Sequence, residues 1–576
     1  MVEIRGVGGP LPRIPDDLTL AQFMLDSHTP IKPVRKEGIP WLIDDETGRR
    51  VGFEELRMRT FGLANALKLK YNIGEDDVVC IYSSNHVDYP VAIWATHRLG
   101  AIVSGANPSY TAPELAYQLE LTKSSVILVH PGSLPTALKA ASLAKIPTNR
   151  IILFDPLPQS GLPTLDQLIN EGLSNEASFV ERRLKPGEGK KKLAFLSFSS
   201  GTTGKPKAVA IPHYSPIANV IQMAVQQKVN EDDKPWDGRR FRPGDVSSGV
   251  LPFYHIYGLV VNLHLMLLSG LTVVVTAKFN FEEFLKSIQR YKITHVWAVP
   301  PHVVLLCKHP SVKNYDLSSV RYLMAGAAPL SAELTTQLTK VLRNSDLGQG
   351  YGMTETCTVV TMYPTAQKIG TLGSAGQLIP GCVARVVKED GSIAKIGEIG
   401  ELVVRSPSNA LGYFLNEEAT RETFVDGWVR TGDEVYFNEN AELFVVDRLK
   451  ELLKVRGFQV APAELEGHLM DHPDIADCCV IGIPDEFSGD LPLAFVVLDN
   501  KAAQRVAKDP TEADKIKASI IKYVADHKIK YKQLAGGVEF IGSIPRNPSG
   551  KLLRRLLRDQ AKESRASEGG KAKAKL

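Results

Sequence analysis

The sequence predicts an α/β fold, with a large N-terminal domain of helix-covered, largely parallel sheets and a small α+β C-terminal domain. Three observations support this prediction. The chain has 576 residues, which is too long for one hydrophobic core. Apolar strands alternate with amphipathic helices as far as about residue 370. Beyond that point, short alternating runs and an Asp390-Gly391 turn indicate hairpins.

The N-terminal alternation begins with a βαβ unit. "DDVVCIYSSN" has the pattern of a buried strand, "DYPVAIWATHRLG" that of a helix ending at glycine, and "AIVSGAN" that of a second strand. Further strands are expected at "SVILVH", "RIILFD", "KLAFLSFSS", "LTVVVTA", "ITHVWAV" and "VRYLMAG". Helices are expected at "FEEFLKSIQRY" and "SAELTTQLTKVLR". Strands this apolar indicate parallel sheets that are covered on both faces.

One stretch raises the alternative of a membrane span, because residues 246–277 contain no Asp, Glu, Lys or Arg. Asn262, His264 and the Ser269-Gly270 break argue against a span. A helix to Leu268 followed by a buried strand at Val273–Val275 explains the stretch better.

The predicted domain boundaries follow changes in this pattern. The N-terminal domain takes residues 1–447, of which about 370–447 form a β-rich, barrel-like subdomain. A hinge at 448–450 precedes a C-terminal domain at 451–560, and a Lys/Ala/Ser/Glu/Gly-rich tail at 561–576 is expected to be disordered.

Composition excludes several classes of protein. A net charge of +4 on 576 residues argues against nucleic-acid binding. The six cysteines form no C-x-x-C pair, which argues against a zinc site or a disulfide framework. The N-terminal segment lacks the apolar core of a signal peptide.

A glycine- and hydroxyl-rich loop, "SSGTTGKPK", suggests a phosphate site. Its glycines would let backbone N–H groups approach a phosphate, and Lys207 adds a positive charge. The spacing does not fit a Walker loop, and a polar surface turn is the alternative.

Four other segments carry candidate ligands. In "GQGYGMTE", the glycines would let the backbone approach a flat ring, and Tyr351 is a candidate for stacking on it, Thr354 for a phosphate and Glu355 for Mg²⁺. It does not match the G-x-G-x-x-G dinucleotide pattern. "RTGDE" places Asp433 where a carboxylate suits ribose hydroxyls, and "NPSGK" ends in Lys551. "DRLKELLKVRGFQ" brings several cations to the domain boundary.

Taken together and in this order, these segments resemble the acyl-adenylate-forming superfamily of acyl-CoA synthetases, 4-coumarate–CoA ligases, firefly luciferases and adenylation domains. "LPFYHIYG", "AGAAPL" and "DRLKELLKVRGFQVAPAELE" extend the resemblance over nearly the whole chain, nearest to the 4-coumarate–CoA ligase-like branch. The resemblance implies an AMP-forming acid–thiol ligase with a mobile C-terminal domain. A carboxylate attacks the ATP α-phosphate and pyrophosphate leaves, then CoA takes the acyl group and AMP leaves.

The resemblance also implies the roles of individual residues. Those expected to bind ATP or AMP are Ser199, Ser200, Gly201, Thr202, Thr203, Lys207, Gln349, Gly350, Tyr351, Thr354, Asp433, Arg448, Lys450, Lys454 and Lys551. Lys551, Lys454, Gln459, Thr354 and Glu355 are expected to be catalytic, with Glu355 the ligand of Mg²⁺ and Lys450 at the hinge. Lys278, Arg456 and Gly457 are expected to contact CoA.

The acyl group is expected to lie against His255, Tyr257, Val261, Met324, Ala327 and Met362. This set is mainly apolar, which favours an aromatic or a medium-to-long-chain aliphatic acid over acetate. The sequence departs from plant coumarate ligases after "MTE" and at Val261, which leaves the acid open. A ligase that loads a carrier protein and a luciferase-like oxygenase remain alternatives, because both use the same adenylate.

The final Ala574-Lys575-Leu576 resembles the S-K-L peroxisomal address. We therefore expect recognition by the peroxisomal import receptor, and a cytoplasmic location otherwise.

Overall fold

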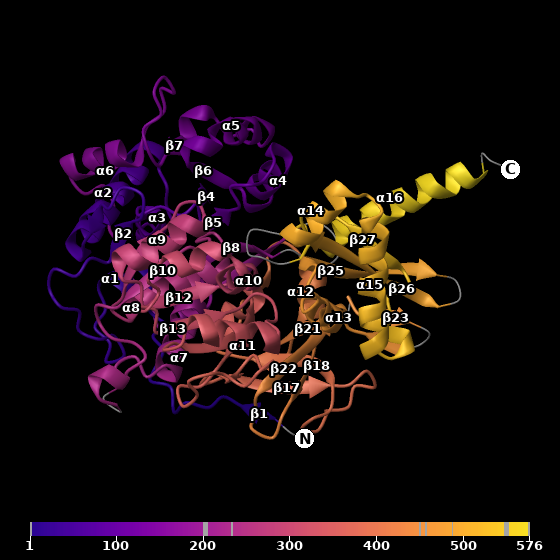
Figure 1. The fold of residues 1–576 in the computed structure, drawn as a ribbon. Coiled ribbons are helices and arrows are strands. Elements are labelled where there is room, and N and C mark those ends of the chain that lie inside the picture. Colours follow the sequence, from indigo (N-terminus) through magenta and orange to yellow (C-terminus); the bar gives the residue numbers. More distant parts are fainter. Residues whose placement is uncertain are drawn as a thin grey trace.

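The computed structural model describes residues 3–199, 206–231, 234–448, 451–455, 458–485, 488–546 and 552–573; side chains at 447, 448, 454, 459 and 566–573 are not described. Its elements form a large N-terminal body, a small antiparallel sheet beneath it and a C-terminal domain at one side (Figure 1). Within the described residues, every helix is too short or too polar to cross a lipid bilayer, which supports the helix–strand interpretation of residues 246–277.

A seven-stranded sheet has the order β19-β9-β8-β5-β4-β6-β7. Strands β4 to β8 are parallel, whereas β9 and β19 are antiparallel additions. The strands are β4 Val78–Tyr82, β5 Ile102–Ala106, β6 Ser124–Val129, β7 Ile151–Leu153, β8 Leu193–Ser199, β9 Lys207–Pro212 and β19 Gly412–Tyr413. Helices α4 (Ala112–Thr122) and α5 (Leu134–Leu143) pack on one face of this sheet.

A nine-stranded sheet has the order β16-β15-β14-β13-β12-β10-β11-β2-β3. Its central strands are parallel and its ends antiparallel, as the apolar runs predict. The strands are β2 Leu42–Asp44, β3 Arg50–Val51, β10 Val246–Gly249, β11 Thr272–Val275, β12 His295–Ala298, β13 Tyr322–Ala325, β14 Asp346–Met353, β15 Thr358–Met362 and β16 Gln377–Leu378.

Helices fill both sides of the nine-stranded sheet. On one side lie α9 (Phe281–Tyr291), α10 (Pro300–Lys308) and α11 (Ala332–Val341). On the other, the main core extends to the first sheet through α1 Leu20–Leu25, α2 Phe53–Tyr71, α3 Tyr89–Arg98, α6 Leu165–Ser174, α7 Tyr214–Gln226, the π-helix η5 Tyr257–Leu265 and α8 Met266–Leu268. The Asn280 side chain caps α9 by accepting hydrogen bonds from the Glu282 and Glu283 amides.

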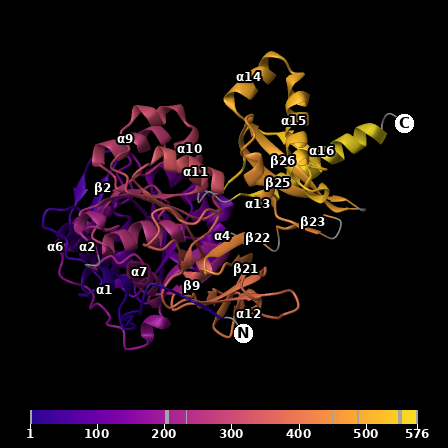
Figure 2. The same ribbon diagram turned by 60° about the horizontal axis from the view of Figure 1, so that its bottom comes forward.

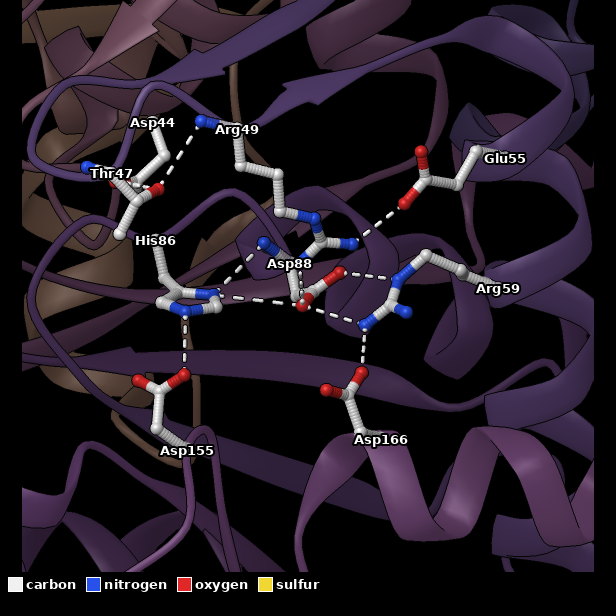
Figure 3. Close-up of polar contacts among 9 residues, drawn as sticks. All are labelled: Asp44, Thr47, Arg49, Glu55, Arg59, His86, Asp88, Asp155 and Asp166. Atoms are coloured by element: carbon white, nitrogen blue, oxygen red, sulfur yellow. Dashed lines mark hydrogen bonds and ion pairs between the residues drawn. The ribbon is translucent and has the colours of Figure 1, made fainter.

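An ionic network holds the outer helices of this body together (Figure 3). Arg59 of α2 makes two 2.7 Å hydrogen bonds to Asp88, which precedes α3, and one of 2.6 Å to Asp166 of α6. His86 Nδ1 accepts a hydrogen bond from the Asp88 amide at 3.0 Å, so its Nε2 is the nitrogen that donates to Asp155 at 3.3 Å. Four chain segments are thereby joined through the buried Arg59 and Asp88.

The β-rich region contains the predicted hairpins, in a six-stranded sheet of order β1-β17-β18-β21-β20 with β22 also on β21. The strands are β1 Ile4–Arg5, β17 Val383–Val387, β18 Gly400–Arg405, β20 Phe424–Val425, β21 Trp428–Phe437 and β22 Leu443–Arg448, with α12 at Glu417–Thr423. The sequence gives no sign that β1, from the N-terminus, joins this sheet.

The C-terminal domain is a five-stranded sheet flanked by helices. Its strands are β23 Leu453–Val455, β24 Phe458–Val460, β25 Ile475–Asp485, β26 Gly489–Leu498 and β27 Gly537–Phe540. Its helices are α13 Pro462–Leu469, α14 Asn500–Lys508, α15 Glu512–His527 and α16 Arg554–Lys573. Helix α16 continues to Lys573, into the tail at 561–576 that the sequence predicts to be disordered. Ala574–Leu576 lie outside the described residues.

The two domains touch along α13. Gly467 lies close to Ser331, with 3.9 Å from the position of a Cβ on the glycine to the serine Cβ. Lys308 of α10 donates to the Met470 carbonyl at 3.5 Å. The predicted hinge begins at Arg448, the last residue of β22, and residues 449–450 lie outside the described chain. In both views the β23 end of the C-terminal domain lies on the side away from the N-terminal body (Figures 1 and 2).

Candidate active site

The centre of the site is the point where β14 changes partner. Through Gln349 it pairs with parallel β13, and from Gly350 onward it pairs with antiparallel β15. The "GQGYGMTE" segment therefore emerges at the carboxyl edge of the parallel strands, where open α/β sheets bind their ligands. The short helix η7, Thr354–Thr356, follows directly.

The glycines of this segment are required by the protein's own packing. A Cβ on Gly348 would lie 2.1 Å from the Tyr363 ring, and one on Gly352 only 1.6 Å from the Thr358 carbonyl oxygen. The structure thus gives these two glycines a different role from the one predicted: they let β14 lie against its neighbours. Gly350 faces Met324, whose Cε would be 3.0 Å from an added Cβ.

Gln349 ties β14 to the "AGAAPL" loop. Its side-chain oxygen accepts from the Leu330 amide at 2.7 Å, and its side-chain nitrogen donates to the Leu330 carbonyl at 3.1 Å. The two bonds fix the loop that carries Ala327, which is exposed and has a left-handed φ of 71°. Gln349 therefore shapes the site through the backbone of this loop.

Tyr351 and Asp433 meet although they are 82 residues apart. The Tyr351 hydroxyl donates a 2.6 Å hydrogen bond to Asp433 Oδ2. Asp433 belongs to β21, where it pairs with Arg448 of β22, and it is only 4% exposed. The structure thus brings the predicted ring-stacking tyrosine to the predicted ribose carboxylate.

Glu355 and Lys207 meet through a residue that the sequence analysis missed. The Tyr413 hydroxyl donates to Glu355 Oε1 at 2.8 Å, and the Lys207 ammonium lies 4.8 Å from the centre of the Tyr413 ring. Burial, with the Glu355 carboxylate as a second cause, raises the pKa of Tyr413, so its hydroxyl keeps the proton that it donates. Nothing in "ALGYFLNEE" marks Tyr413 locally; its pairing with β9 brings it to Lys207.

Two of the predicted acyl-contact residues, Met324 and Met362, lie beside Gly350. Met324, Val261 and Met362 are buried on β13, η5 and β15, and Met362 pairs directly with Gly350. The Tyr257 hydroxyl donates to the Met324 carbonyl at 3.3 Å, and burial raises its pKa. His255 precedes η5, and its Nδ1 accepts from the Tyr257 amide at 3.3 Å. Of these predicted acyl-contact residues, only His255 and the Tyr257 hydroxyl are polar.

Asn85 supports this pocket from behind. It is 4% exposed and makes three hydrogen bonds to the segment before His255: its amide donates to the Gly249 and Leu251 carbonyls at 2.9 Å, and its oxygen accepts from the Phe253 amide at 2.8 Å. The sequence analysis did not select Asn85, since its role depends on contacts across 164 to 168 residues.

Comparison with known proteins decides the family. The model of AMP-binding enzymes matches residues 32–414, and that of the AMP-binding enzyme C-terminal domain matches residues 464–551. The chain belongs to the AMP-binding enzyme family. This confirms the predicted resemblance and the predicted class of AMP-forming acid–thiol ligase at the level of the family.

The similar proteins match this chain over almost their full length. 4-Coumarate–CoA ligase 3 of Arabidopsis thaliana is 37% identical over 531 residues, covering 90% of this chain and 88% of the relative. An acyl-CoA ligase of Emericella nidulans is 32% identical over 571 residues, covering 95% and 97%. The crystal structure of an anthranilate CoA ligase with anthranoyl-AMP has a TM-score of 0.81 at 24% identity, covering 96% of this chain and 99% of that one, which confirms the fold.

Several predicted residues of this AMP-binding enzyme cannot be placed. Ser200, Gly201, Thr202, Thr203, Lys450, Arg456, Gly457 and Lys551 lie outside the described residues. The side chains of Arg448, Lys454 and Gln459 are not described either, although Lys454 and Gln459 pair across the β23–β24 hairpin. Ser199 ends β8 and pairs with Lys207, which begins β9. Lys278 is exposed just after β11.

Glu355 fits a magnesium ion that arrives with a nucleotide. Mg²⁺ prefers hard oxygen ligands and is commonly bound by one or two carboxylates together with substrate phosphates. Glu355 is a single carboxylate, 6% exposed, and Tyr413 contacts both it and Lys207. A carboxylate and a lysine ammonium thus lie on the two sides of one tyrosine.

Proposed function

We propose that this protein is an ATP-dependent acid–CoA ligase that acts on an apolar carboxylic acid, with an aromatic acid of the cinnamate type as its substrate. In the first step a carboxylate oxygen bonds to the ATP α-phosphorus and the bond to pyrophosphate breaks. In the second, the CoA sulfur bonds to the acyl carbon, AMP leaves, and the thiol proton is lost to solvent. The carrier-loading and oxygenase alternatives share only the first step.

The observation that carries the choice of acid is the group of Tyr257, Met324 and Met362: both methionines lie beside Gly350, and Tyr257 is hydrogen-bonded to Met324. These side chains are buried and uncharged, and the Tyr257 hydroxyl is engaged by the Met324 carbonyl. Methionine sulfur and a tyrosine ring favour contact with a flat aromatic group. A second carboxylate, as in a dicarboxylic acid, would find no counter-charge among these residues.

The residues of the site suit the adenylation step. The acid is already ionised at neutral pH, so the step needs no general base. It needs positive charge and orientation, because a carboxylate and a triphosphate repel each other. Lys207 lies at the base of the phosphate loop, and the Tyr351–Asp433 pair offers an oriented carboxylate to the ribose hydroxyls. Mg²⁺, when bound at Glu355, would supply charge neutralisation on the phosphates.

A substrate screen tests this function. The purified protein would be incubated with ATP and Mg²⁺ and with cinnamic, benzoic, phenylacetic, octanoic, malonic or acetic acid, with and without CoA. Pyrophosphate release and acyl-CoA formation by mass spectrometry would both be recorded. We expect cinnamic-type acids to react at least 100-fold faster than acetate or malonate, and one acyl-CoA to form per pyrophosphate. Preference for acetate or malonate, or pyrophosphate release without any thioester, would contradict the proposal.

The chain's final Ala574-Lys575-Leu576 supports a second proposal, a peroxisomal location through the import receptor. A fluorescent protein fused to the N-terminus would report it in cells. Deletion of these three residues should leave the fusion protein in the cytoplasm, whereas unchanged peroxisomal fluorescence would refute the proposal.

A further inference from the structure

We propose that Tyr413 is a positioning residue that sets both Glu355 and Lys207 for nucleotide binding, through its hydroxyl and its ring respectively. This inference rests on the proposed function, because it assigns these two side chains to ATP. The proposal assigns Tyr413 itself no contact with the substrate or the reacting atoms. It acts through the two charged groups on either side of it.

The hydroxyl side of Tyr413 holds Glu355. The 2.8 Å bond to Glu355 Oε1 fixes the rotation of a carboxylate that is 6% exposed. A hydrogen bond to a charged group is stronger than one between neutral groups. Glu355 is held by its backbone as well, because its carbonyl accepts from the Ala410 amide at 2.9 Å, three residues before Tyr413.

The ring side of Tyr413 supports Lys207. The ammonium lies 4.8 Å from the ring centre, within the distance at which a cation is attracted to an aromatic face. The two residues are brought together by the sheet, since Tyr413 pairs with Val209 and Gly412 with Ala210, on the strand that Lys207 begins. Lys207 is therefore held against the Tyr413 ring at the start of β9.

Tyr413 is fixed in turn by α12 and β20. Its amide donates to the Thr420 hydroxyl oxygen at 2.9 Å, and the edge of its ring meets Phe424 at 5.6 Å between ring centres. Gly412 has a φ of 148°, and a Cβ there would lie 2.6 Å from the Thr420 methyl carbon. Contacts within the "GYFLNEEATRETF" segment thus hold the Tyr413 ring in place.

Two substitutions separate the two contacts. Tyr413→Phe removes the hydroxyl but keeps the ring, whereas Tyr413→Leu removes both. Calorimetric titration with ATP, in the presence of Mg²⁺ and in the presence of a chelator, measures binding without requiring catalysis. We expect Tyr413→Phe to weaken MgATP binding about tenfold and leave metal-free ATP within twofold of wild type. Tyr413→Leu should in addition weaken metal-free ATP about threefold.

The control variant is Tyr291→Phe, because Tyr291 ends α9 and its hydroxyl also donates a hydrogen bond, to the Asp45 carbonyl at 3.2 Å. It should bind both forms of ATP as wild type does. The positioning role would be overturned if Tyr413→Phe bound MgATP normally, or if it lost affinity for both forms equally. If the wild-type protein bound ATP but adenylated no acid, the proposed function would fail, while the titrations would still decide the role of Tyr413.

Discussion

The Tyr351 hydroxyl lies 2.6 Å from Asp433 Oδ2, so a residue of the nine-stranded sheet holds a carboxylate of the six-stranded sheet. The bond leaves one orientation for the carboxylate that we assign to the ribose. Asp433→Ala should raise the KM for ATP about 100-fold, and Tyr351→Phe about tenfold, because bonds to a charged group contribute about 1.5–3 kcal/mol. Pyrophosphate–ATP exchange measures both. Tyr436→Phe, in the same strand, is the control and should leave this KM unchanged. An equal KM for ATP in Tyr351→Phe and wild type would show that the Tyr351 hydroxyl does not orient Asp433 for the nucleotide.

Substitution of Lys551 should slow the adenylation half-reaction and spare the thioester-forming one. Lys551→Ala removes the cation that the family resemblance assigns to the carboxylate and α-phosphate, so adenylation should fall at least 1000-fold. Attack of CoA on a supplied acyl adenylate should stay within about threefold of wild type, because that step needs no such cation. Lys562→Ala, an exposed lysine of α16, is the matched control. Loss of both half-reactions to the same extent would show that Lys551 has another role.

Asn85 should control the acyl pocket from outside it. Asn85→Ala leaves two carbonyls and one amide of residues 249–253 without their partner, which should destabilise the protein by about 3 kcal/mol. The same change should raise the KM for the acid more than that for ATP, since His255 and Tyr257 follow this segment. Thermal melting and steady-state kinetics measure the two effects. The exposed Asn440→Ala should show neither, and a variant with a normal KM for the acid would confine Asn85 to a structural role.

Acid should weaken the contact between His86 and Asp155. The hydrogen bond from the His86 ring holds the pKa of Asp155 below its usual value. A carboxyl with a lowered folded-state pKa stabilises the fold above its unfolded-state pKa of about 4, and this contribution is lost as the pH falls through the folded-state value. Because Asp155 is half exposed, Asp155→Asn should cost no more than about 0.5 kcal/mol at pH 7. The difference in melting temperature from wild type should shrink as the pH falls from about 4 to about 2.5, through the lowered folded-state pKa; a difference that grows over this interval would contradict this account.

The sequence is a good guide to elements whose cause is local. The buried strand Val78–Tyr82 and the helix Phe281–Tyr291 lie where their apolar patterns place them. Contacts between distant segments leave no local pattern, and so β1, Asn85 and Tyr413 were missed. The glycines of "GQGYGMTE" show a further limit. Glycines at these positions predict that the backbone lies close to another group. Only the structure shows that the groups are the Tyr363 ring and the Thr358 carbonyl.

The pairing of β1 with β17 attaches the beginning of the chain to the sheet that ends at the predicted hinge, while α16 carries the other end of the chain outward (Figure 1). A donor dye near Arg5 would then be fixed to one side of that pivot, and an acceptor on α16 to the other. Energy transfer between the two would test the predicted rotation of the C-terminal domain during turnover without placing a label in the active site. Because β1 is paired with β17, labels near the two ends of the chain would report the distance between the two domains in single molecules.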